Sequence, residues 1–154
     1  MKLAAKPAMK RAARKGPAFA FVVEELLDSM IAERVRVRAM FGAHAVYIGP
    51  KLHFFLRQRP DKETRRDNGM WVVIEPDHVT SVRKQFPSLR PIEIFAAYAS
   101  TGGFTHWLNL PDSDDGFEQT ALEFCRLVIG GDPRLGKVPK ERVRKPRRKQ
   151  ARSF

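Results

Sequence analysis

The chain has 154 residues, of which 43% are hydrophobic and 30% are charged, and its formal net charge is +12. This length suits one domain with a hydrophobic core, and the composition is that of a globular protein rather than a disordered one. No apolar run reaches the roughly 18 residues that a membrane-spanning helix needs. These features exclude a membrane-spanning protein and a pair of full-sized domains.

The net positive charge lies at the two ends of the chain. Residues 1–16 hold six basic side chains and no acidic one, and residues 134–154 hold ten basic side chains and one acidic one, Glu141. The middle, residues 17–133, has thirteen basic and sixteen acidic side chains, a net charge of −3. Both ends are also poor in large apolar residues, so we predict disordered basic tails on a slightly acidic domain.

The single cysteine and the N-terminal residues indicate the cellular compartment in which the protein is expected. Cys125 is the single cysteine, which excludes an intramolecular disulfide and favours a reducing compartment, the cytoplasm. The apolar stretch after Pro17 is short and ends at Glu24 and Glu25, so we predict no secretory signal. A basic, acid-free start would also fit a mitochondrial transit peptide if the source were eukaryotic.

The first half of the domain is predicted to be one helix followed by four strands. A helix is expected over residues 18–33, because apolar residues recur every three or four positions after Pro17. Alternation predicts strands at 35–40, 43–48 and 51–57, the last two joined by a Gly49-Pro50 turn. A charged loop at 58–69 and a strand at 71–74 follow. Arg36 and Arg38 share one side of the first strand and are expected to pair there with neighbouring acids.

The second half is predicted to be a helix, two strands and a helix. Asp77 is placed to cap a helix that ends near residue 86, and strands are expected at 92–98 and 104–110. Asp115, with Glu118 three residues on, is typical of a helix start, and Gly130-Gly131 of a helix end. The sequence therefore predicts a single α+β domain with a mainly antiparallel sheet of five or six strands.

The segment 37–56, VRAMFGAHAVYIGPKLHFFL, follows an amphipathic helix and resembles the N-terminal domain of the TfoX/Sxy family. Met40, Phe41 and Gly42 match the Met-Phe-Gly-Gly signature of that family, and Ala43 stands where the second glycine is usual. The stretch 105–110, THWLNL, and the last helix are more similar to the related MmcQ/YjbR proteins. The resemblance implies a secretion-chaperone-like fold and a non-enzymatic, regulatory role.

The basic tails favour contact with nucleic acid. Lysine and arginine bind phosphates and release counterions, and tails reach phosphates more readily than base edges, so the contact would not depend on base sequence. The candidate side chains are Lys10, Arg11, Arg14, Lys15, Arg142, Arg144, Lys145, Arg147, Arg148 and Lys149. An anionic membrane surface is the competing partner.

The preferred hypothesis is an accessory protein whose tails contact nucleic acid while its acidic body docks a protein partner or a second copy. A third hypothesis is a protein–protein adaptor whose tails have no role.

The alternative is a small-molecule-binding or enzymatic domain with a cleft lined by His44, Tyr47, His53 and Trp107. Counting from the turn at residues 49–50 places His44 and His53 nearly opposite each other, but no third ligand is spaced to complete a metal site. Strand aromatics are expected mainly in the core. Cys125 lies on the apolar stripe of the last helix and is predicted to be an inert core thiol. We therefore assign no catalytic residue, metal or cofactor.

Overall fold

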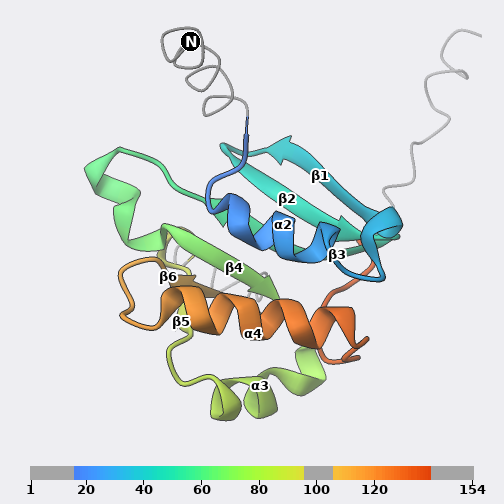
Figure 1. The fold of residues 1–154 in the computed structure, drawn as a ribbon. Coiled ribbons are helices and arrows are strands. Elements are labelled where there is room, and N and C mark those ends of the chain that lie inside the picture. Colours follow the sequence, from blue (N-terminus) through green and yellow to red (C-terminus); the bar gives the residue numbers. More distant parts are fainter. Residues whose placement is uncertain (1–15, 96–105, 140–154) are drawn as a thin grey trace, which may run out of the picture.

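The computed structural model describes residues 16–95 and 106–139, and in it one antiparallel sheet is covered by helices (Figure 1). The sheet has six strands in the order β1-β2-β3-β4-β6-β5. They are β1 (Val35–Met40), β2 (Ala43–Ile48), β3 (Lys51–Arg57), β4 (Gly69–Val73), β5 (Arg90–Pro91) and β6 (Trp107–Pro111). The helices are α2 (Ala20–Leu27), α3 (Val79–Gln85) and α4 (Phe117–Ile129). The predicted single α+β domain with an antiparallel sheet is confirmed, and the order of elements matches in outline, with β5 in place of the strand expected at 92–98.

The first three strands have the bounds that the sequence predicted, because two tight turns fix them. β1 pairs with β2 from Val35↔Ile48 to Met40↔Ala43, which leaves two residues for the turn. Those residues, Phe41 and Gly42, both have positive φ, +52° and +76°. Gly49 opens the next turn with a φ of +60°, which glycine adopts at no steric cost.

The first helix is shorter than predicted, since it ends at Leu27 rather than near residue 33. The Ser29 hydroxyl donates a 2.7 Å hydrogen bond to the Leu26 carbonyl, and Ser29 Oγ accepts one from the Ile31 amide. This local bonding replaces the helical ladder. The chain then makes a separate 3₁₀ helix, Ala32–Arg34.

The strand predicted at 92–98 is wrong in its described part. β5 covers only Arg90 and Pro91, and residues 93–95 form a 3₁₀ turn. The amides of Glu93 and Ile94 donate to the buried carboxylate of Asp67 instead of to a neighbouring strand. Residues 96–105 lie outside the described residues, and β6 begins at Trp107.

The two predicted helix caps do not form. The N-cap of α3 is His78 rather than Asp77, and that of α4 is Gly116 rather than Asp115, neither with a side-chain cap. Just before α4, the carboxylate of Asp114 accepts the Gly116 amide at 3.1 Å. The predicted end of α4 is confirmed at Gly130. Within the charged loop, residues 62–67 form a 3₁₀ helix.

The chain from residue 134, assigned to the basic tail by its sequence, lies along the sheet as far as Lys137. Leu135 is 0% exposed and bridges to Ile74, and Lys137 bridges to Leu52. The arginines and lysines singled out in the tails, at 10–15 and 142–149, lie outside the described residues.

The two faces of the sheet bury different side chains. One face packs against α2, α3 and α4 in the main core, through residues such as Phe54, Leu56 and Val72. Alternate strand residues pack in a second cluster, through Ala45, Phe55, Trp71, Val73 and others. The register places Phe55 opposite Ala45 and Trp71, so this second cluster lies on the other face.

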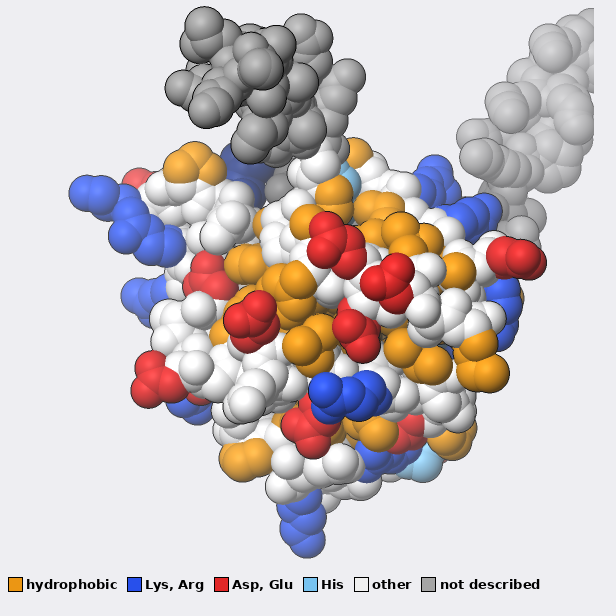
Figure 2. All heavy atoms as spheres, viewed as in Figure 1, with side chains coloured by type: hydrophobic (Ala, Val, Ile, Leu, Met, Phe, Trp, Pro, Cys, Tyr) orange, Lys and Arg blue, Asp and Glu red, His pale blue; other side chains and the backbone are white. Residues whose placement is uncertain are grey.

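The strands carry charge of one sign. The six strands carry five basic residues and no acidic one: Arg36, Arg38, Lys51, Arg57 and Arg90. Figure 2 shows acidic side chains interspersed with apolar ones over the helix side. Arg36 and Arg38 are exposed, and the pairing expected for them is absent, since neither forms an ion pair among the described residues. The strands are therefore a region of net positive charge.

Candidate ligand-binding site

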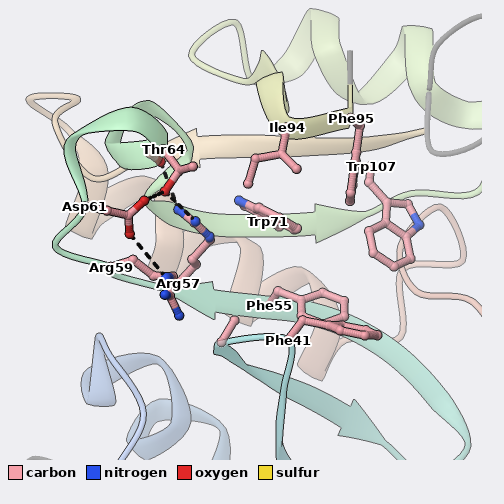
Figure 3. A pocket seen from close by; sticks show the side chains of 11 residues that line it. Phe41, Phe55, Arg57, Arg59, Asp61, Thr64, Trp71, Ile94, Phe95 and Trp107 are labelled. Carbon is pink, nitrogen blue, oxygen red and sulfur yellow. Dashed lines mark hydrogen bonds and ion pairs between the residues drawn. The ribbon is translucent and has the colours of Figure 1, made fainter. Parts of the chain in front are cut away.

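A pocket of about 710 Å³ lies on the second face of the sheet (Figure 3). Strand residues, the β1–β2 turn, the β3–β4 connection and the turn after β5 all contribute to it. The lining residues are Phe41, Ala43, Phe55, Arg57, Arg59, Asp61, Thr64, Trp71, Ile94, Phe95 and Trp107. This volume is within the range of sites that hold small molecules.

The walls of the pocket are mainly aromatic. The ring centroid of Phe55 lies 5.9 Å from that of Trp71 and 5.2 Å from that of Trp107, and Phe95 is 5.3 Å from Trp71. The Trp71 indole N–H donates to the Asp67 carbonyl at 2.8 Å, so its polar atom is satisfied away from the cavity. The rings therefore present flat apolar surfaces, which suit a planar ligand.

Arg57 lies at the polar end and is only 4% exposed. Its Nη1 donates to the Thr64 carbonyl (3.0 Å) and to Asn68 Oδ1 (2.9 Å), and its Nη2 donates to Thr64 Oγ1 (2.9 Å). The guanidinium carbon lies 5.9 Å from the centroid of the Trp71 ring. Burial lowers the pKa of Arg57, and the charges of Asp67 and Asp61 partly offset that effect. Arg57 forms no ion pair with any carboxylate of the described residues.

The β3–β4 connection holds this guanidinium in place. Thr64 donates its hydroxyl proton to Asp61 while accepting from Arg57, and Arg59 Nε donates to Asp61 at 3.4 Å. The bond from Thr64, followed by smaller contributions from Arg59 and the backbone, keeps the pKa of Asp61 below its usual value. Asn68 links Arg57 to Arg59, because the side-chain oxygen that accepts from the Arg57 guanidinium also accepts a 2.9 Å hydrogen bond from the backbone amide of Arg59. These side chains fix one another before any ligand arrives (Figure 3).

Two N–H groups of Arg57 have no partner among the described residues. A guanidinium has five N–H donors, and three are taken by Thr64 and Asn68. Because Nη1 and Nη2 both bond Thr64, the remaining donors are Nε–H and one Nη2–H on the adjacent edge. Such a pair of parallel N–H groups matches the two oxygens of a carboxylate or a phosphate.

The four residues of the predicted cleft do not converge. Trp107 lines this pocket, whereas His44 lies opposite Leu56, on the helix side, and lines a smaller hollow of about 430 Å³. Tyr47 packs against the second cluster without lining the pocket. The expectation that His44 and His53 lie nearly opposite each other is wrong. A bulge at Val46/Tyr47 shifts the register and leaves His53 without a partner opposite it.

His53 and Cys125 are both buried away from the pocket. Burial lowers the pKa of His53 to about 4, against a weak contact of Nδ1 with the Lys51 carbonyl at 3.3 Å. Burial likewise raises the pKa of the Cys125 thiol to about 12, the property of an inert core cysteine. The described part of the chain contains no cluster of three His, Cys, Asp or Glu side chains that could hold a metal ion.

Sequence reasoning missed the polar end of the pocket and the Trp71 ring, and it favoured the core for Phe55 and Phe95, which line the pocket. The polar end is formed by the end of β3 and the loop after it, through Arg57, Arg59, Asp61 and Thr64. The sequence of this stretch is highly charged, which is typical of a solvated loop. One signal was present in β3: alternation places Arg57 on the same face as Phe55, at the end of a strand that is otherwise strongly apolar. Of the family signature, only Phe41 lines the pocket.

Comparison of the chain with protein-family models, with curated proteins and with solved structures finds no match. The resemblance to the TfoX/Sxy family therefore remains a prediction from the sequence, as does contact of the tails with nucleic acid. None of the helices in the described ranges is long and apolar enough to cross a membrane.

Proposed function

We propose that the protein is a ligand-binding domain whose pocket holds a small anionic molecule with a flat apolar body. The observation that carries this proposal is Arg57, a residue 4% exposed that lies at the end of an aromatic pocket and forms no ion pair within the described chain. A buried cation is costly unless an opposite charge compensates it. Asp67 and Asp61 compensate the charge of Arg57 only in part and without direct contact. A carboxylate or phosphate on Nε and Nη2 would add a directly bonded negative charge, and the rings would cover the rest of the ligand.

Binding without turnover is the activity that these residues favour. Thr64 is the only hydroxyl among the described lining residues, and it already donates to Asp61 and accepts from Arg57. It is thus held by two strong partners rather than presented to a substrate. The same bonds keep the guanidinium preorganised, which lowers the entropy cost of binding.

The proposed preference for an anion can be tested with 2-naphthoate and 2-naphthamide, two molecules that differ in charge but have nearly the same shape. We expect the protein to bind the naphthoate about tenfold or more tightly, because a hydrogen bond to a charged group contributes about 1.5–3 kcal/mol. Calorimetry gives the affinities. Fluorescence reports the location, because the chain has two tryptophans and both line the pocket.

Replacing Arg57 by methionine is expected to abolish the preference for naphthoate and to leave naphthamide binding within about threefold, since Met keeps the length and loses the charge. The control is Arg83→Met, which removes the same charge from an exposed position on α3. It should bind both probes as the wild type does. If Arg57→Met is folded by circular dichroism and still prefers the naphthoate as strongly as the wild type, the proposal is wrong.

A further inference from the structure

Phe41 has a backbone conformation that its side chain does not favour. It occupies the first position of the two-residue β1–β2 turn with a φ of +52°, followed by Gly42 at +76°. A hairpin turn with two positive φ values is of type I′ and prefers Asn-Gly. A bulky residue in the left-handed region is a true outlier and is found where some other interaction requires it.

The Phe41 ring is also almost fully exposed. It is 87% exposed and nevertheless lines the mouth of the pocket (Figure 3). A large ring left in water gains nothing in the unliganded protein, and here it is held at that place by a strained turn. Both observations are explained if the ring acquires its packing partner when a ligand enters.

The turn is physically connected to the polar end of the pocket. A Cβ added at Gly42 would collide with the Arg59 guanidinium, so the backbone of the turn lies directly against that side chain. Arg59 in turn donates a hydrogen bond to the Asp61 carboxylate, which also accepts one from the Thr64 hydroxyl. Phe41 therefore lies next to the group of side chains that holds Arg57.

We propose that Phe41 is a ligand-contacting residue whose ring closes over the apolar body of the molecule held by Arg57. This inference rests on the proposed function. The ligand is then covered on several sides: Phe55, Trp71 and Trp107 form the walls, and Phe41 provides the outer cover. Such a site selects an anion that carries a broad flat hydrophobic group and discriminates against small inorganic anions, which cannot reach the ring.

The test is Phe41→Asn in the full chain, titrated with 2-naphthoate. Asn relieves the strain in the turn, so we expect the midpoint of thermal unfolding to rise by about 3–6 °C. It removes the ring, so we expect naphthoate affinity to fall about tenfold or more. Greater stability with weaker binding is a combination that a purely structural role does not produce. Phe41→Leu, which restores an apolar side chain, should recover most of the affinity.

The control is Met30→Asn, which removes an equally exposed large apolar side chain (86%) from a position outside the pocket. It should bind 2-naphthoate as the wild type does. Naphthoate binding by Phe41→Asn equal to that of the wild type overturns this inference and leaves the proposed function standing. Absence of binding by the wild type itself overturns both.

Discussion

Replacing Asp67 by alanine is expected to lower the free energy of unfolding by about 3 kcal/mol or more and to weaken naphthoate binding at the same time. Asp67 is 2% exposed, and its carboxylate accepts hydrogen bonds from the amides of Glu93 and Ile94 at 2.7 and 2.8 Å. These two bonds fix the turn that carries Ile94 and Phe95 into the pocket wall. Alanine would leave two amides without their charged acceptor.

Urea unfolding, monitored by tryptophan fluorescence, measures the decrease in the free energy of unfolding. Asp67→Asn should fall between the wild type and Asp67→Ala, because the carboxamide keeps one oxygen for these amides. The matched control is Asp77→Ala, an exposed aspartate that makes no helix cap, which should change the free energy by under about 0.5 kcal/mol. Equal stability of Asp67→Ala and Asp77→Ala would show that the carboxylate does not anchor this wall.

Lowering the pH from about 6.5 to about 4 is expected to reduce the free energy of unfolding by about 3 kcal/mol through His53 alone. Burial lowers the pKa of His53 from 6.5 to about 4, and the nearby charges of Lys51 and Arg34 act in the same direction. Within that window the unfolded chain binds a proton that the folded chain does not. Stability is therefore fully present above pH 6.5 and falls as the pH drops.

The variant His53→Gln should lose most of this pH dependence between pH 6.5 and 4.5 in urea unfolding series. Gly136 lies directly against the His53 ring, so protonation should also loosen residues 134–139. Hydrogen exchange at the Gly136 amide, which donates to the Val73 carbonyl at 2.8 Å, reports that loosening. An unchanged slope in His53→Gln would mean that other groups carry the acid sensitivity.

Local patterns predicted those parts of the fold that local bonds determine. Alternation and the glycine turn defined β1, β2 and β3, because two-residue connections fix their register. The strand expected at residues 92–98 failed for the opposite reason. The carboxylate of Asp67 accepts hydrogen bonds from the amides of Glu93 and Ile94, which are 26 and 27 residues away in the sequence. The pattern of apolar residues in either segment does not indicate such a long-range bond.

The candidate site was less predictable than the fold. Trp107 was identified, but His44 and His53 were expected nearly opposite each other, whereas the register, which includes a bulge at Val46/Tyr47, places Leu56 opposite His44. Arg57 was overlooked because arginine beside a charged loop is usually solvated, and its burial depends on Thr64 and Asn68 folding over it. Similarly, Leu135 reaches the core from a basic segment whose composition favoured a tail.

A crystal structure of the full chain with 2-naphthoate tests the central claim most directly. We expect the carboxylate within hydrogen-bond distance of Arg57 Nε and Nη2, and the naphthalene ring between Phe55 and Phe41. A naphthoate bound elsewhere on the protein, or one in the pocket with its carboxylate turned away from Arg57, would contradict the account.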